Sequence, residues 1–142
     1  MKLNGVFVAY LGEKMNACLA IPFNWARAHL VVVSGSGPNV CGHAILNAGD
    51  YYFHVDGLNG RPWHMPEGGY RRYLRENQKR ELFRRFVPLK NPAGAQEKLE
   101  ELGAKNWRWL AIPNNCASYV EEIFAAGGSS ESIVTNCPVR WK

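Results

Sequence analysis

Residues 41–55 read CGHAILNAGDYYFHV, and this stretch decides the fold. Its two halves carry apolar and aromatic residues, and Ala48-Gly49 separates them. The stretch therefore predicts two antiparallel strands, 41–47 and 50–55. A buried strand is expected before them, because His29-Leu30-Val31-Val32-Val33 is rich in β-branched residues and a Ser-Gly loop follows.

Two helices are expected later in the chain. Asn91-Pro92 supplies a capping residue and a proline at the first helical position, so a helix should run to about Leu102 and stop at Gly103. A second helix should open at Pro113-Asn114-Asn115 and close at Gly127-Gly128.

The intervening segments complete the predicted fold class. Glycine and proline are frequent in residues 57–69, which are expected to form a loop, and another strand is expected over 82–89. A short final strand is expected near Ile133. Strands followed by two helices predict an α+β fold, with an antiparallel sheet packed against helices. Residues 1–142 should form a single domain.

The formal net charge of +5 favours anionic partners such as nucleic acid, acidic lipid or bacterial wall polymers. The apolar stretch from Val6 to Leu11 is short, and Glu13 and Lys14 interrupt it, so no signal peptide is expected. No apolar run approaches the length of a transmembrane segment. The protein is therefore expected to be made in the cytoplasm and to need a dedicated secretion system if it leaves.

Four cysteines, Cys18, Cys41, Cys116 and Cys137, are widely spaced and form no CxxC pair. If a structural disulfide forms, Cys18 and Cys137 are the expected partners. Whether Cys41 is also oxidised stays open at this point.

Cys116 is the candidate nucleophile. With Asn115 as the N-cap, it becomes the first helical residue, near backbone N–H groups and the positive end of the helix dipole. Both features stabilise a thiolate, which is the reactive form of cysteine. It also heads an apolar helix face made of Cys116, Tyr119, Val120, Ile123 and Phe124. The N–H groups could serve as oxyanion donors, assisted by Asn115 or Asn114.

The hairpin carries two candidate partners for this thiol. If Ala48-Gly49 is a two-residue turn, Asn47 pairs with Asp50 and His43 lies opposite His54. Opposed residues share a sheet face with about 5 Å between their Cβ atoms. One imidazole can then act as a base while the other fixes its tautomer and orientation.

These motifs resemble a known superfamily. Gly42-His43-Ala44-Ile45-Leu46, Gly49 and Tyr52-Phe53-His54 look like the paired strands of NlpC-type papain-like cysteine peptidases. Asn115-Cys116-Ala117-Ser118-Tyr119-Val120, followed by Gly127, is similar to the nucleophile helix of the lecithin:retinol acyltransferase branch. The histidines precede the cysteine, as in the circularly permuted subgroup.

The resemblance implies a permuted papain-like fold in which Cys116 is the nucleophile, His43 the base and His54 the polar third member. It implies no cofactor. The acyltransferase branch usually has Glu-His where Ala117-Ser118 stand here, and the C-terminal membrane anchor of many animal members is not expected for this protein. Both departures make lipid acyl transfer a less expected activity.

The expected activity is that of a cysteine hydrolase cleaving an amide bond through a thioester. The resemblance suggests a bacterial cell-wall peptide amidase or endopeptidase, or a secreted antibacterial effector, which would be matched by a cognate inhibitor protein. A protein peptide or isopeptide bond is the next alternative, followed by hydrolysis or transfer of a lipid acyl ester.

Two readings of another class are also open. Cys41, His43, His54 and Cys116 could ligate zinc, but their spacing matches no usual zinc pattern, so no metal is expected. Cys41 could also replace Cys116 as the nucleophile, although a strand thiol lacks the assistance of a helix end.

The stretch from Arg71 to Arg85 mixes arginines with aromatics, as in a basic nucleic-acid-binding module. A charged helix face followed by a half-exposed strand is the expected interpretation.

Overall fold

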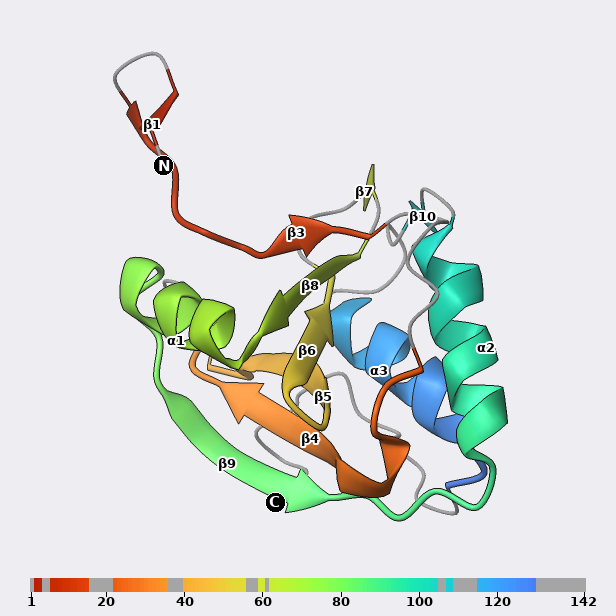
Figure 1. The fold of residues 1–142 in the computed structure, drawn as a ribbon. Helices are drawn as coiled ribbons and strands as arrows, with labels where there is room; N and C mark the ends of the chain where they lie inside the picture. Colours follow the sequence, from red (N-terminus) through yellow and green to blue (C-terminus); the bar gives the residue numbers. More distant parts are fainter. Residues whose placement is uncertain are drawn as a thin grey trace.

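A six-stranded antiparallel sheet forms the centre of the fold in a computed structural model (Figure 1). The structure describes residues 2–3, 6–15, 22–35, 40–55, 59–60, 62–104, 107–108 and 115–129, with the backbone alone for 2–3, 6–7, 59–60, 107–108 and 115. The strand order in the sheet is β3 (Glu13–Lys14), β8 (Trp63–Pro66), β6 (Tyr51–His54), β5 (His43–Ala48), β4 (Ala28–Val33) and β9 (Glu81–Phe86). Two short strand pairs lie outside it: β1 (Lys2–Leu3) with β2 (Val6–Phe7), and β7 (Asn59–Gly60) with β10 (Trp107–Arg108).

Helices cover both faces of this sheet. Helix α1 (Glu67–Glu76) lies on one face, and α2 (Pro92–Gly103) and α3 (Asn115–Ala126) lie on the other, with a 3-10 turn, η1 (Trp25–Arg27), leading into β4 (Figure 1). Two apolar clusters fill the two sides. One contains Leu30, Val32, Ala44 and Leu46 together with residues of α2 and α3, and the other contains Val31, Val33, Ile45 and Tyr52 with Tyr70 and Tyr73 of α1.

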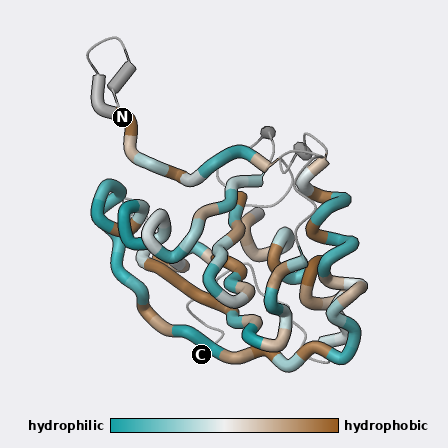
Figure 2. Tube along the Cα trace, viewed as in Figure 1, coloured by the Kyte–Doolittle hydropathy of each residue, from teal (hydrophilic) through white to brown (hydrophobic). Residues whose placement is uncertain are grey.

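This arrangement explains the uninterrupted apolar run in β4. Successive strand residues point to opposite faces, and both faces are covered, so Leu30, Val31, Val32 and Val33 are all buried. Figure 2 shows β4 as an apolar band between the two layers. The α+β class, the antiparallel sheet and the helices packed on it are therefore confirmed.

Most predicted elements are present with small shifts in their ends. The strand predicted over 82–89 is β9, which starts and ends slightly earlier. Asn91 caps α2, because its side-chain oxygen accepts a hydrogen bond of 3.1 Å from the Gly94 amide. Helix α3 includes Asn115, so Cys116 is its second residue rather than its first. Gly128 follows that helix with φ of 81°, a conformation that favours glycine. The strand expected near Ile133 falls outside the described residues.

The loop predicted over 57–69 is wrong in its second half. Residues 63–66 form β8, which pairs with β6 over four positions and with β3 on its other side. Helix α1 then begins at Glu67. The pairing with two neighbouring strands outweighs the local turn preference of this Gly- and Pro-rich sequence.

The predicted register of the hairpin is also wrong, by two residues. Ala48 pairs with Tyr51, and Gly49-Asp50 forms the turn in place of Ala48-Gly49. Gly49 has φ of 65°, the positive value that the first residue of this turn needs. Alanine disfavours a positive φ, so Ala48 is poorly suited to that position. A shift of two residues preserves the face to which each side chain points. His43 and His54 therefore lie diagonally on one face instead of directly opposite each other.

No helix within the described part of the chain is both long and apolar enough to cross a membrane.

Candidate active site

The thiol of Cys116 lies against the strand that carries His43. Cys116 is 3% exposed and belongs to the apolar cluster between α3 and the sheet. The backbone N–H of Ala44 donates a hydrogen bond of 3.4 Å to its Sγ. Pairing between β5 and β6 runs from Ala48 to Leu46, so the beginning of β5 lies beyond that ladder. The sulfur therefore meets the sheet at its end, one residue along the strand from His43.

His43 and His54 are hydrogen-bonded to each other. The His43 Nε2 and His54 Nδ1 atoms are 2.9 Å apart, and the two rings meet edge to face. His54 is fully buried, and the aromatic ring of Tyr73 from α1 contacts it on another side. The expectation that the two imidazoles share one sheet face is thus met, although they reach each other diagonally.

A backbone carbonyl determines which nitrogen of each ring carries the proton. His54 Nε2 lies 2.7 Å from the Leu11 carbonyl oxygen, and this oxygen can only accept, so His54 Nε2 must be the protonated nitrogen. In the neutral ring, Nδ1 is then an acceptor and His43 Nε2–H donates to it. The lone pair of neutral His43 is consequently on Nδ1, which makes that atom the proton acceptor of the pair.

The segment around Leu11 is fixed to α1. Asn77 donates through Nδ2 to the Tyr10 carbonyl at 2.8 Å, and the Tyr10 amide donates to Glu76 Oε1 at 2.9 Å. Gly12 has φ of 116°, which turns the chain from these contacts into β3. Sequence reasoning did not find this segment, because a backbone carbonyl has no side-chain signature and lies 43 residues from its partner.

The surroundings of His43 keep its imidazole neutral. Burial lowers its pKa well below the ordinary value of 6.5, and the neighbouring His54 and the positive charge of Lys79 lower it further. A neutral imidazole at neutral pH is the form that can accept a proton from a thiol.

This lowered pKa predicts a pH-dependent stability. The unfolded chain binds a proton on residue 43 near pH 6.5, whereas the folded protein resists it, so the free energy of unfolding should fall as the pH drops below about 6.5. Above that pH the stability that depends on neutral His43 is fully present. Below it, the free energy of unfolding should fall with a slope that approaches about 1.4 kcal/mol per pH unit. Urea unfolding of the wild type and His43→Asn between pH 5 and 8 measures this contribution. Parallel curves for the two proteins would contradict a lowered pKa of His43.

The alternation of side chains separates the two histidines from α3. By the alternation of side chains along a strand, His43 and His54 point to the same sheet face as Ile45 and Tyr52, which pack in the cluster with α1. Ala44 points to the opposite face, which α3 covers. The described hydrogen bond of the sulfur comes from the Ala44 amide at the end of the sheet. Hydrogen bonds between a nucleophile and its base often tighten only when substrate binds. The structure therefore brings the two histidines together and holds the thiol on the adjacent peptide unit.

The other predicted site residues have different outcomes. The Asn115 side chain and all of Asn114 lie outside the described residues, so their assisting roles stay predictions. The expected Cys18–Cys137 disulfide is wrong, because Cys41 is disulfide-bonded and Cys116 is not, so either Cys18 or Cys137 is the partner of Cys41. Cys41 is disulfide-bonded, which removes it as a thiolate nucleophile or zinc ligand, whereas Cys116 is not in a disulfide. No three His, Cys, Asp or Glu side chains in the described ranges are arranged to hold a metal ion.

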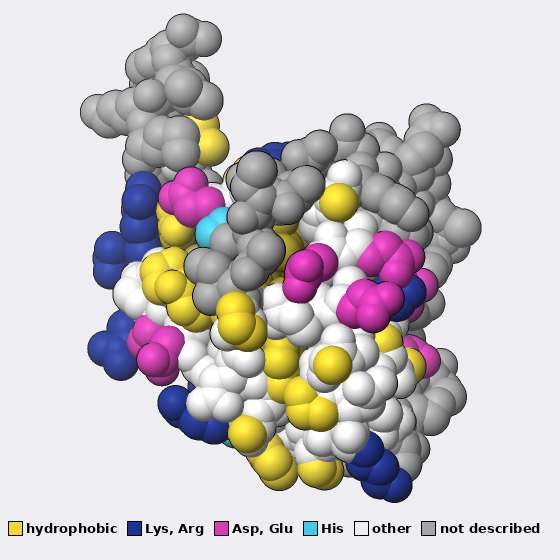
Figure 3. All heavy atoms as spheres, turned by 45° about the vertical axis from the view of Figure 1, so that its right-hand side comes forward, with side chains coloured by type: hydrophobic (Ala, Val, Ile, Leu, Met, Phe, Trp, Pro, Cys, Tyr) yellow, Lys and Arg dark blue, Asp and Glu magenta, His cyan; other side chains and the backbone are white. Residues whose placement is uncertain are grey.

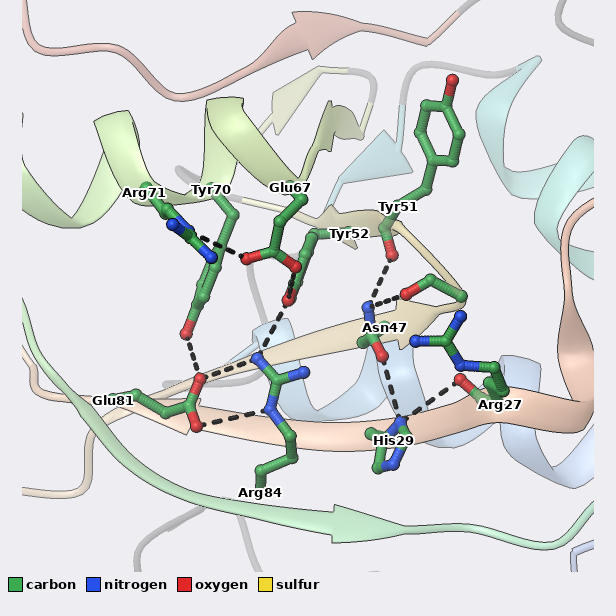
Figure 4. A network of polar contacts seen from close by, with 11 residues as sticks. Arg27, His29, Asn47, Tyr51, Tyr52, Glu67, Tyr70, Arg71, Glu81 and Arg84 are labelled. Atoms are coloured by element: carbon green, nitrogen blue, oxygen red, sulfur yellow. Dashed lines mark hydrogen bonds and ion pairs between the residues drawn. The ribbon is translucent and has the colours of Figure 1, made fainter.

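The basic stretch from Arg71 to Arg85 is partly neutralised by glutamates. Figure 4 shows Tyr70 and Arg84 meeting at Glu81, while the Tyr52 hydroxyl donates to Glu67. The rings of Tyr52 and Tyr70 stack with 4.0 Å between centroids, which joins α1 to the sheet. Further ion pairs are Arg71–Glu67 and Arg72–Glu76. These contacts fit a charged helix face followed by a half-exposed strand.

The space-filling view agrees with this interpretation. On the face in Figure 3, lysine and arginine side chains stand in separate groups, with acidic and apolar side chains between them. A broad basic surface of the kind that binds nucleic acid is not seen on that face.

Comparisons with protein-family models, with curated proteins and with solved structures find no match for this chain.

Proposed function

We propose that this protein is a cysteine hydrolase that cleaves an amide bond, with Cys116 as nucleophile, His43 as base and His54 as the group that orients His43. The observation that carries the proposal is the 2.9 Å hydrogen bond between the imidazoles of His43 and His54. The amide of Ala44, the residue after His43, donates a hydrogen bond to the Cys116 sulfur. The resemblance to permuted papain-like enzymes supports the same assignment.

In this mechanism, His43 Nδ1 accepts the thiol proton and the sulfur attacks the amide carbonyl carbon. The C–N bond then breaks as His43 returns the proton to the leaving amine, which leaves a thioester on Cys116. Water hydrolyses the thioester, releasing a carboxylic acid and restoring the thiol. His54, anchored on the Leu11 carbonyl, holds the His43 ring in the orientation and tautomer that accept the thiol proton.

The developing oxyanion needs hydrogen-bond donors near the sulfur. Backbone N–H groups at the beginning of α3 are suited to this role, because they have no partner within the helix and lie at the positive end of its dipole. Asn115 or Asn114 would assist them. No metal or cofactor takes part in the proposed reaction.

For the substrate, we favour an amide bond in a bacterial cell-wall peptide. The net charge of +5 would hold the protein near an anionic polymer. Such an enzyme would be exported by a dedicated secretion system and matched by a cognate inhibitor protein. A lipid acyl ester could undergo the same chemistry, and it is the alternative that the experiment below must separate.

Digestion of purified peptidoglycan tests the proposal. Mass spectrometry is expected to find new amine and carboxylate termini at one wall-peptide bond after treatment with wild-type protein, and none after treatment with Cys116→Ala. Phospholipid vesicles treated in parallel report ester cleavage. Wall peptides left intact, with fatty acid released in a Cys116-dependent manner, would favour the lipid alternative. Equal products from both proteins would rule out cysteine chemistry.

A further inference from the structure

A lysine is fixed beside the proposed base at the end of the sheet. Lys79 Nζ donates to the Ser34 carbonyl at 2.9 Å. Ser34 directly follows β4 and is bonded twice to Arg80, through its amide to the Arg80 carbonyl and through its Oγ to the Arg80 amide. Val33, the last residue of β4, pairs with His43 at the beginning of β5 and with Glu81 at the beginning of β9. Lys79 lies two residues before Glu81, so these three strand ends bring Lys79 close to His43.

Lys79 also lies on the same side of the sheet as the His43 ring. It comes three residues after α1, the helix that covers the face to which His43 and His54 point, and its amide bonds to the carbonyl of Leu74 in that helix. The effect of its charge on the pKa of His43 agrees with this proximity. The ammonium group is thus a positioned charge and not a mobile surface lysine.

A cation in this position acts against the base that it adjoins. During the reaction His43 becomes an imidazolium, and a second positive charge nearby raises the cost of that step. A negative group bound between them offsets the repulsion. His43 gives its proton to the leaving amine, so the part of the substrate closest to His43 and Lys79 is the leaving group. In an amino acid, the α-carboxylate is separated from the amine nitrogen by a single carbon.

We propose that Lys79 binds a carboxylate on the leaving side of the scissile amide, so that the preferred substrates release an amino acid or short peptide carrying a free carboxylate next to the new amine. This inference rests on the proposed function and narrows it to one substrate class. The bonds that form and break are those of the hydrolysis above, and the carboxylate itself is unchanged.

A matched pair of peptides tests the inference. Both contain the wall-peptide bond cleaved in the digest, and their leaving residue ends in a carboxylate in one and in a carboxamide in the other. For the wild type, kcat/KM is expected to be about tenfold or more higher for the carboxylate, the worth of a charge-assisted hydrogen bond. In Lys79→Gln this ratio should fall close to one. Lys90→Gln, which removes a lysine beyond the other end of β9, should keep the wild-type ratio.

Binding gives a readout that does not depend on turnover. With Cys116→Ala as the background, calorimetry should show tighter binding of the carboxylate peptide, and the added Lys79→Gln change should remove that preference. An equal ratio for the two peptides in the wild type, or an unchanged ratio in Lys79→Gln, would overturn the inference while leaving the hydrolase intact. If neither peptide is cleaved in a Cys116-dependent manner, the proposed function fails, and the inference fails with it.

Discussion

Replacing Cys116 by alanine is expected to lower peptide turnover by on the order of 10³-fold or more, because the nucleophile itself is lost. The fold should persist, since the change removes only a sulfur atom from a buried position at the head of α3. His43→Ala should cost nearly as much, because the thiol then lacks the base that accepts its proton. His54→Ala should cost less, since His54 acts through His43.

The double variant makes this prediction specific. Residues that work as one unit are strongly non-additive, so Cys116→Ala with His43→Ala should be no slower than either single variant. His29→Ala is the matched control, because His29 lies on the neighbouring strand and contacts Asn47 and the Arg27 carbonyl instead of the site. Turnover of the wall peptide and thermal unfolding should be measured for each protein. Multiplicative losses in the double variant would contradict a nucleophile–base unit.

The sequence predicted the secondary structure well wherever local chemistry was strong. Asn91-Pro92 and Gly127-Gly128 mark helix ends by capping preferences that act within a few residues. The β-branched run in β4 identified a buried strand. Residues 63–66 were missed because pairing with β6 and β3 outweighs the local turn preference of this Gly- and Pro-rich segment, and β3 is distant in the sequence and only two residues long.

The candidate site shows the same division between local and distant information. The parity of His43 and His54 within the hairpin could be predicted, because a two-residue error in register leaves the shared face unchanged. The shift itself followed from the preference of the turn for Gly49 at a positive φ. By contrast, the roles of Leu11 and Lys79 depend on contacts between segments far apart in the chain. No pattern in the sequence around either residue indicates those contacts.

Gly12→Ala is expected to lower kcat/KM by about a hundredfold, the effect of misplacing a catalytic group by about 1 Å. Gly12 has φ of 116°, and a Cβ there would lie 2.8 Å from the backbone oxygen of His64. The chain from Leu11 to Glu13 must therefore shift, which moves the Leu11 carbonyl away from His54 Nε2. His54 can then place its proton on Nδ1, so that His43 must accept at Nε2 and carry its own proton on Nδ1. In that form His43 cannot take the proton of Cys116.

Imidazole nitrogen chemical shifts distinguish this mechanism from simple damage to the fold. In the wild type, both histidines should be protonated on Nε2, whereas in Gly12→Ala the two should change to the Nδ1 form together. Gly68→Ala is the matched control: it lies in α1, and the added carbon meets no atom within 4 Å other than those of its chain neighbours and its own helix backbone, so activity and tautomers should stay as in the wild type. If Gly12→Ala loses activity while both rings keep the Nε2 proton, the Leu11 carbonyl does not set the tautomer. Full activity with the carbonyl displaced would remove Leu11 from the site, because the His43–His54 pair would then function without its backbone anchor.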